Sequence, residues 1–559
     1  MDAIAPTSQA SGGQGKAWIG WLGALVVFAW GLAVLPGIGV GFDENVHATY
    51  GELVLKGYQT GGRDTRNVEY KDLMFYGPWV DALAAAFYGG EDGQRSYPLR
   101  HALALAFTAL TLPAAFYLGR AATGGWPGGL AAMVAMALMP RYLGHGMFNT
   151  KDVPFACLFA WSLAWVWGIR GQLWRLGWRE AVGLGGLAGL CMGVRVGGLL
   201  VFVILGAAAG IAWTRETMAL GKLEAARVRE TAVALGWWAL AFGIAYTLMV
   251  SVWPWAWSSP FSRPMEAMDR FSSFRHQSWL AFDGKVVFSR NVPLTYLPVH
   301  LLLGTPVAWL ALGALGAGAG LAACWRKPIA AEGRQDPRTE ATVLGVLVWL
   351  VLPLIYVFLT RPTLYGAGRQ FFFMAPAIAV AGGMGFGLLW RLFPKHQTRV
   401  LAIFGIGALW AGWGTFRLHP YEYTYYNEFA GPRATLPERF EMDDWALSYR
   451  EAALWLNEQQ ARLPGRPLKI QVAANDYSMP CLLTFLDPRI HAEPLVYASY
   501  GRVDEASKFP RLPADVDYYV TFNDPNGFRM YPKTPIVHTV SSQGAALCLI
   551  RANTPYPVP

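Results

Sequence analysis

The strongest constraint on this chain is a long uncharged apolar run that ends in two adjacent carboxylates. The run covers residues 17–42, and Asp43 and Glu44 follow it directly. Because about 20 apolar residues are enough to cross a bilayer as a helix, the run predicts a transmembrane helix. It is too long for the core of a signal peptide, so we expect it to remain as an anchor. Acidic groups at the edge of a membrane cost insertion free energy, which favours a functional use for these two.

The composition agrees with a protein that crosses the membrane many times. Of its 559 residues, 54% are hydrophobic and only 15% are charged, whereas a soluble chain carries about 25% charged residues. A formal net charge of +9 is also typical of nucleic-acid-binding proteins. Here much of the basic excess lies in loops that we predict to be cytoplasmic. The positive-inside rule accounts for it, and no nucleic-acid partner is expected.

Further single spans are predicted from other runs of apolar residues. They lie at 99–119, 126–143, 153–169, 231–253, 294–323, 341–360, 371–390 and 400–416. Between the first two spans, the polar segment 41–98 holds two stretches of helical apolar spacing, at 45–56 and 72–88. We predict that these stretches form helices lying along the membrane surface.

The apolar run 181–213 is too long for one crossing. As a single helix at 1.5 Å per residue it would be about 50 Å long, against a hydrocarbon core of about 30 Å. The basic residues that flank it are Arg170, Arg175, Arg179, Arg215, Lys222, Arg227 and Arg229. Because they stand on both sides, the run is predicted to be a hairpin that crosses twice, with Arg195 near its outer turn. Together with the single spans this gives about eleven crossings, and it places Asp43 and the C-terminal region outside.

Three regions are expected on this topology. Residues 1–16 form a disordered cytoplasmic tail, residues 17–417 a transmembrane domain, and residues 418–559 an extracytoplasmic α/β domain. In the last region, apolar patterns predict helices at 441–460 and 477–485 and strands at 468–474, 517–522 and 545–550. Its two cysteines, Cys481 and Cys548, are able to pair if the region is exported, and their spacing leaves this open.

Acidic, basic and phenolic side chains gather on the predicted outer side. They are Asp43 and Glu44 in the first loop, Lys151 and Asp152 in the second, Arg195 at the hairpin turn, Arg290 in a later loop, and Tyr365 and Arg369 in the last. Sugar transfer from a polyprenyl phosphate needs a carboxylate to take the acceptor's proton and cations to hold the leaving phosphate. Arginine suits the second task because its planar fork binds phosphate oxygens in pairs. The pattern therefore predicts a membrane glycosyltransferase.

Six short motifs, in order along the chain, resemble those of a known family. They are Asp43-Glu44, Phe148-Asn149-Thr150-Lys151-Asp152-Val153-Pro154-Phe155, Trp253-Pro254-Trp255, Pro293-Leu294-Thr295-Tyr296-Leu297-Pro298, Gly368-Arg369-Gln370-Phe371-Phe372-Phe373 and His419-Pro420-Tyr421-Glu422-Tyr423. The motifs resemble those of protein O-mannosyltransferases and the bacterial phospholipid-carrier-dependent glycosyltransferases. These belong to the GT-C superfamily, and the chain looks like glycosyltransferase family 39 and the lipid A aminoarabinose transferases. The resemblance covers residues 41–457.

The resemblance implies a fold, a mechanism and roles for particular residues. It implies an α-helical polytopic GT-C fold, inversion at the sugar and a polyprenyl- or dolichyl-monophosphate donor. By position, Asp43 would be the base or acceptor-orienting acid, with Glu44 beside it, Asp152 as a second acid and Arg369 as a phosphate contact. We predict further contacts to the lipid phosphate from Lys151, Arg195, Arg290 and Tyr365. No ligand spacing demands a metal ion, and a divalent metal is left open.

The same residues also have structural interpretations. Asp43 suits the N-cap of a following helix, and Asp152 suits the first turn of one, where the helix dipole favours an acid. A polytopic transporter or flippase would also bury charge, although we find neither internal repeats nor paired broken helices. An assembly protein with a partner-binding outer domain is a third alternative. The sugar, and whether the acceptor is a protein, a glycan or a lipid, stay open.

Overall fold

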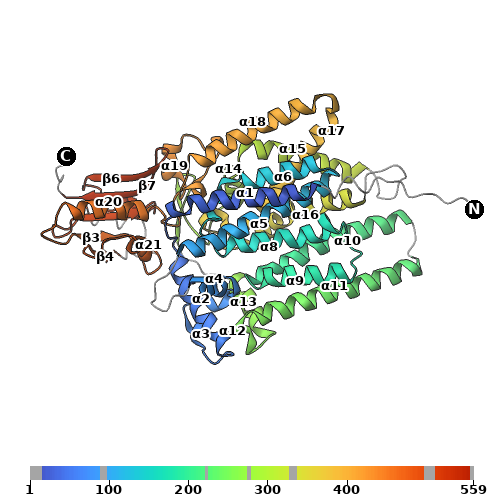
Figure 1. Ribbon diagram of the computed structural model, residues 1–559, viewed down its shortest axis with the longest axis horizontal. Helices are drawn as coiled ribbons and strands as arrows, with labels where there is room; N and C mark the ends of the chain where they lie inside the picture. The colour runs from blue at the N-terminus through green and yellow to red at the C-terminus, as the bar shows by residue number, and fades with distance from the viewer. Residues whose placement is uncertain are drawn as a thin grey trace, which may run out of the picture.

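The computed structural model describes residues 16–88, 97–220, 224–272, 278–326, 337–495 and 510–553. A bundle of long helices makes up most of the chain, and a small sheet domain is joined to one end of it (Figure 1). The predicted fold class, an α-helical polytopic membrane protein with a C-terminal α/β domain, is confirmed. The predicted disordered tail lies outside the described residues except for Lys16.

The described residues contain nine helical segments that are long and apolar enough to cross a membrane. Their main helices are α1 (Trp18–Val34), α5 (Tyr97–Thr123), α8 (Asp152–Leu163), α10 (Leu200–Leu220), α11 (Ala225–Ser251), α15 (Val307–Arg326), α16 (Pro337–Thr360), α17 (Ala375–Leu392) and α18 (Gln397–Phe416). Two shorter helices, α6 (Trp126–Ala137) and α9 (Trp178–Met192), run in the same bundle (Figure 1). Among the described residues, nine of the eleven predicted crossings thus have a helix long and apolar enough to span, while α6 and α9, which lie where the other two are predicted, are shorter.

The predicted hairpin is present as α9 and α10. Between these helices Arg195 has an extended backbone (φ −148°, ψ 134°). The returning chain packs directly on the end of α9, because a Cβ on Gly198 would lie 2.6 Å from the backbone nitrogen of Met192. Arg175, before α9, forms an ion pair of 2.8 Å with Glu216 near the end of α10. The start of α9 and the end of α10 therefore lie together, which is the arrangement of a hairpin.

The prediction of one span at 294–323 is wrong at its start. Helix α14 (Tyr296–Leu303) ends at Gly304, and α15 begins only at Val307. Pro306 separates them because proline has no N–H with which to continue the hydrogen-bond ladder of α14. The candidate span is α15 alone, and α14 packs against the 3₁₀ segments at 366–374 and 428–430.

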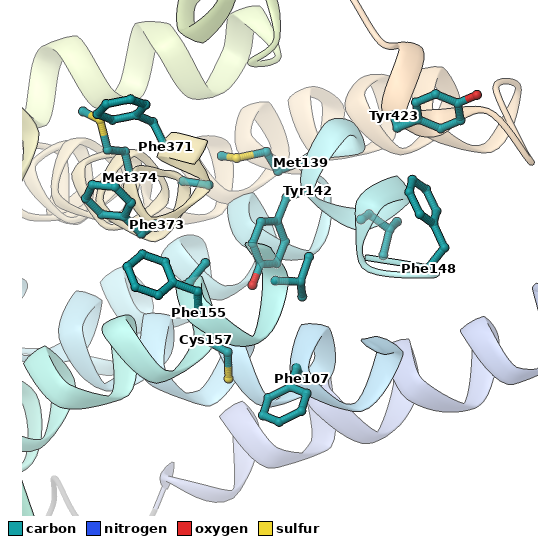
Figure 2. Close-up of a cluster of buried hydrophobic side chains, with 14 of the residues drawn as sticks. Phe107, Met139, Tyr142, Phe148, Phe155, Cys157, Phe371, Phe373, Met374 and Tyr423 are labelled. Carbon is teal, nitrogen blue, oxygen red and sulfur yellow. The ribbon is translucent and has the colours of Figure 1, made fainter. Parts of the chain in front are cut away.

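Aromatic packing under the outer loops holds the segments that carry the charged residues. Figure 2 shows part of this core, with Phe148, Phe155, Phe373 and Tyr423 among the labelled side chains. The ring of Phe155 in α8 lies edge-on to that of Phe373, with 5.8 Å between centroids, and Phe148 meets Tyr423 at 5.6 Å. Burial of each such side chain is worth about 1.5–3 kcal/mol. The core thus fixes α8 and the 3₁₀ segment η6 (Gly366–Met374) against each other.

The first outer loop folds into short helices at the end of the bundle that carries the sheet domain (Figure 1). They are α2 (Glu44–Gln59), α3 (Arg66–Glu69), η3 (Leu73–Phe75) and α4 (Trp79–Tyr88). The loop packs tightly on the hairpin turn, since a Cβ on Gly77 would lie 1.8 Å from the carbonyl oxygen of Gly193. This contact brings Tyr76 next to Arg195.

The C-terminal domain is built on a five-stranded sheet in the order β4-β3-β5-β7-β6. The strands are β3 (Lys469–Val472), β4 (His491–Pro494), β5 (Tyr518–Phe522), β6 (Ile536–Ser542) and β7 (Ala545–Ala552). β3 is parallel to β4 and β5, while β7 is antiparallel to β5 and β6. The three predicted strands are confirmed, and a short helix, α21 (Met479–Leu483), lies within the helix predicted at 477–485. Cys481 and Cys548 are both free and buried.

The predicted helix at 441–460 is wrong in its first part, because α20 covers only Tyr449–Ala461. The preceding residues form a turn around Asp443, whose carboxylate accepts N–H groups of Leu447 (3.1 Å) and Ser448 (3.2 Å). A side chain that binds the backbone in this way competes with the helical hydrogen bonds. The change matters for the site, because the turn places Glu441 and Asp444 in the wall of a cavity.

Candidate active site

A cavity of about 490 Å³ lies between the C-terminal domain and the end of the bundle to which that domain is joined (Figure 1). The bundle side contributes Asp43, Lys151, Tyr365 and Arg369. The C-terminal domain contributes a second wall that includes Asn475, Tyr477 and Asn523. The floor of the cavity is therefore charged, and its roof is polar and aromatic.

Two carboxylates and three cations form one connected network at the floor and directly beneath it. Asp43 Oδ2 lies 2.8 Å from Lys151 Nζ and 3.5 Å from Arg369 Nη2. Asp152 lies 3.4 Å from Arg369 Nη1 through Oδ2 and 2.6 Å from Arg195 Nη2 through Oδ1. The side chains are shielded from water, since Asp152 is 2% exposed and Asp43, the most open of them, 18%. Arg369 thus bridges the two acids, and the network has a formal charge of +1.

Asn149 orients the two charged residues that precede and begin α8. Its Oδ1 accepts the backbone N–H groups of Lys151 (3.0 Å) and Asp152 (2.9 Å), and its Nδ2 donates to Asp152 Oδ2 (2.8 Å). This is the way an Asn side chain starts a helix. Asp152 therefore has the helix-end position that the sequence predicts, and it binds two guanidinium groups from the same position.

Arg369 is positioned by a backbone turn in η6. Gly366 and Gly368 have φ angles of +54° and +76°, in the left-handed region that favours glycine. A Cβ at Gly366 would lie 3.0 Å from Asp444 Oδ2, so the turn also approaches the C-terminal domain closely. The guanidinium of Arg369 lies 4.4 Å from the ring centroid of Trp445 and 5.4 Å from that of Tyr365. Tyr365 therefore lines the cavity as a cation–π partner of Arg369.

The electrostatics of the floor keep Asp43 ionised. Burial raises the pKa of its carboxyl, but the charges of Lys151 and Arg369 outweigh burial and hold that pKa far below its usual range. On the opposite wall the carboxyl pKa values are raised instead of lowered. Burial raises the pKa of both Glu441 and Asp444, and the charge of Arg369 offsets part of the rise at Asp444. The cavity therefore joins a cationic floor to an acidic wall, which the sequence did not reveal.

Glu44 points away from the cavity, although it is adjacent to Asp43. Its carboxylate accepts the backbone N–H of Gly41 (2.5 Å) and lies 2.9 Å from His101 Nε2. Arg100 Nε is 4.0 Å away. Glu44 is 3% exposed, and it ties the loop that carries Asp43 to helix α5.

A second buried network, missed in the sequence, lies behind the floor. Asp81 binds Arg100 Nη2 and His47 Nδ1, each at 2.6 Å, and Arg100 also donates to the hydroxyl of Thr150. Burial raises the pKa of Asp81, but His47 and Arg100 outweigh it and bring that pKa down to about 2. Arg100 thus connects the loop of Asp43 with the residue next to Lys151. The sequence feature that pointed to this network was Arg100 itself, at the start of the apolar run 99–119. A charged residue is rare in such a run unless it has a partner.

The other residues predicted to contact the lipid phosphate lie outside the cavity lining. Arg195 stands behind Arg369, bound to Asp152, and neither Arg195 nor Asp152 is among the described residues that line the cavity. Arg290 is exposed at the end of strand β2 (Lys285–Phe288) and is likewise absent from the described lining. Within the described part of the chain, no group of three or more His, Cys, Asp or Glu side chains is arranged to hold a metal ion.

No protein-family model and no curated protein sequence matches this chain. Among solved structures, it is similar to ArnT from Cupriavidus metallidurans in the apo state, at 15% identity and a TM-score of 0.49, over 96% of this chain and 99% of that chain. The same protein bound to undecaprenyl phosphate matches at 14% identity and a TM-score of 0.48, over 97% and 99%. An Archaeoglobus fulgidus oligosaccharyltransferase, in complex with Zn and sulfate, matches at 11% identity and a TM-score of 0.48, over 89% and 68%.

Both proteins are GT-C glycosyltransferases, the superfamily that the sequence motifs resemble. At identities of 15% or less and TM-scores below 0.5, the likeness stands as an observation only. The function proposed below rests on the geometry of the cavity.

Proposed function

We propose that this chain is a membrane glycosyltransferase that moves a sugar from a polyprenyl-phosphate donor to an extracytoplasmic acceptor with inversion. The observation that supports this most is the floor of the cavity, where Asp43 contacts Lys151 and Arg369 at the end of a transmembrane bundle. An anionic headgroup on a membrane-held chain fits a site with net positive charge at this level. The carboxylate beside the cations supplies a proton acceptor.

In the proposed reaction, the acceptor hydroxyl attacks the anomeric carbon of the donor sugar. The bond from that carbon to the phosphate oxygen breaks, and Asp43 takes the hydroxyl proton. The leaving lipid phosphate gains one negative charge, which Lys151 and Arg369 stabilise. Attack opposite to the leaving group inverts the anomeric configuration.

The formal charges stay balanced through this step. The network of Asp43, Asp152, Lys151, Arg195 and Arg369 has a charge of +1, and a sugar phosphodiester has a charge of −1. After transfer the lipid phosphate has a charge of −2, and the protonated Asp43 has raised the network to +2. A buried site that avoids net charge in both states avoids a large desolvation cost.

Asp43 becomes a competent base only when the donor is present. In the donor-free protein Lys151 and Arg369 hold its pKa too low for efficient proton transfer at neutral pH. Phosphate oxygens compete for the same two cations, so donor binding weakens their hold on Asp43 and raises its pKa. Asp152 and Arg195 act behind them by fixing Arg369, while Glu44 positions the loop of Asp43.

We assign the cavity to the extracytoplasmic face, which in a bacterium is the periplasmic face of the inner membrane. Basic residues such as Arg175 and Arg227 lie at the opposite end of α9–α11 from the cavity, where they pair with Glu216. The positive-inside rule places such an end in the cytoplasm.

Purified protein in nanodiscs, incubated with radiolabelled polyprenyl-phosphate sugars, tests this function. Protein, glycan and lipid acceptors are offered in parallel, and wild type is compared with Asp43→Asn. Label should move to one acceptor class in the wild type only, with release of polyprenyl phosphate. Movement of the intact lipid-linked sugar between leaflets, without cleavage, would instead identify a flippase.

A further inference from the structure

An amphipathic segment beside the cavity exposes a stripe of large apolar side chains. The segment consists of α12 (Pro254–Trp257) and α13 (Ser262–Ser272), at the outer end of the bundle next to α2 and the end of α11 (Figure 1). The exposed fractions are 75% for Phe261, 69% for Met265 and 43% for Met268. Met265 and Met268 are three residues apart and share one face of α13, and Phe261 immediately precedes the helix. We call these three residues the α13 stripe.

The other faces of α13 show that the stripe is not the result of loose packing. Ala267 is buried, and Phe271 packs on Tyr76 with 4.8 Å between ring centroids. Arg263 and Glu266, whose side chains are 39% and 50% exposed, pair with each other at 2.8 Å. The helix thus has a packed face, a charged face and an apolar exposed face, which is the pattern of a helix lying in a membrane interface.

The α13 stripe continues the lipid-facing surface of α11. The ring of Phe261 stacks on Tyr246 of α11 at 5.9 Å, and the Tyr246 hydroxyl donates to the carbonyl of Pro260 at 2.7 Å. Along α11, Phe242 is 40% exposed, and its ring lies 6.0 Å from that of Tyr246. Because α11 is long and apolar enough to span a membrane, the rings of Phe242, Tyr246 and Phe261 extend its apolar surface onto the start of α13.

The opposite edge of α13 reaches the cavity. Arg270 Nη2 forms an ion pair of 2.7 Å with Asp72, and both residues line the cavity. Phe271 contacts Tyr76, whose ring lies 5.3 Å from Lys151 Nζ. One short helix therefore separates an apolar exposed surface from the cationic floor.

We propose that the α13 stripe is embedded in the outer leaflet of the membrane and that α13 forms the wall past which the donor's lipid chain enters the cavity. The first part concerns the bilayer alone, and the second part rests on the proposed function. A donor whose head binds at Lys151 has its chain directed toward the bilayer, and α13 is the element that joins these two regions. The Arg270–Asp72 pair stands at the headgroup level of this wall.

Fluorescence quenching tests the first part without any enzyme assay. Cys324 is the one half-buried native thiol among the described cysteines, and it is first replaced by Ala in the full chain. Met265→Cys is then introduced, and the new thiol is labelled with NBD. Ile536→Cys, at a site 48% exposed on the outer domain, is the matched control. In phosphatidylcholine nanodiscs, lipid carrying a doxyl group near the headgroup should reduce the emission at position 265 by about twofold and leave position 536 unchanged. Quenching at 265 by aqueous iodide but not by doxyl lipid overturns the proposal.

Transfer kinetics test the second part. Met265→Glu should raise KM about tenfold for a long-chain polyprenyl donor and leave KM unchanged for a short water-soluble donor. Phe429→Glu, at a 71% exposed site in the 3₁₀ segment Glu428–Ala430, should change neither value. An equal effect of Met265→Glu on both donors overturns the role of α13 as the wall. If the wild type transfers no sugar, the proposed function fails, while the quenching result still decides the membrane contact.

Discussion

Replacing Asp43 by Asn removes the proposed base while keeping the size of the side chain and one acceptor oxygen. A general base contributes about 10²–10⁴-fold to a rate, so kcat should fall by that factor, or about 3–5 kcal/mol in activation free energy. The fold should persist, because the amide oxygen introduced by Asp43→Asn would still accept a hydrogen bond from Lys151, which the native carboxylate binds at 2.8 Å.

The same substitution should leave donor binding unchanged or strengthen it, although it lowers kcat. In the wild type, the donor phosphate has to replace Asp43 as the partner of Lys151. Two unit charges 2.8 Å apart attract with about 6 kcal/mol at an effective dielectric constant of about 20, and desolvation cancels most of this. We therefore expect KM for the donor to stay level or to fall by up to about tenfold, while kcat falls by the factor given above.

Steady-state kinetics in nanodiscs, with the lipid donor varied at saturating acceptor, measures both changes. Asp476→Asn is the matched control, since Asp476 is exposed beside the cavity-lining residues Asn475 and Tyr477. A kcat for Asp43→Asn within about threefold of wild type would refute the role of Asp43 as base, given the factor expected of one. A KM that rises as kcat falls would refute the competition between donor phosphate and Asp43.

Three further predictions follow from the two networks. Arg369→Lys keeps the charge but loses the planar fork, so the donor KM should rise about tenfold or more with a smaller change in kcat, measured in the same assay. Arg100→Met leaves Asp81 buried beside an apolar side chain, so it should lower the free energy of unfolding by about 3–5 kcal/mol and lower the Tm. Adding Asp81→Asn should restore most of the lost stability. An unchanged Tm in the single variant would contradict the pairing of Arg100 with Asp81. Because cations depress the pKa of Asp43 in the free enzyme and donor phosphate competes for them, the acidic fall of kcat should lie at higher pH than that of kcat/KM. Coinciding acidic limbs would show that donor binding does not release the carboxylate.

The sequence predicted those features that depend on local pattern and on membrane topology. Asp43, Lys151 and Arg369 each stand next to an apolar run, so a consistent topology was enough to place them on one side of the membrane. The hairpin followed from the length of the run 181–213 and from the basic residues that flank it. The roles of these residues stay predictions until transfer is measured.

The features that the sequence did not predict depend on contacts between distant segments. Asp81 and Arg100 lie on α4 and α5, and nothing in either helix reveals that they form a pair of 2.6 Å. Glu441 and Asp444 were assigned to a helix because the apolar spacing of α20 extends backward over them. Asp443 prevents α20 from starting earlier, because its carboxylate binds the backbone N–H groups of Leu447 and Ser448. The spacing of apolar residues does not reveal such side-chain hydrogen bonds.

A structure of the protein with polyprenyl phosphate bound would show directly whether Lys151 and Arg369 hold the donor's phosphate. We predict phosphate oxygens within about 3 Å of both Lys151 Nζ and the Arg369 guanidinium, with the Asp43–Lys151 contact lengthened beyond hydrogen-bond distance. A phosphate bound outside the cavity, or one that leaves the Asp43–Lys151 ion pair intact, would contradict this prediction.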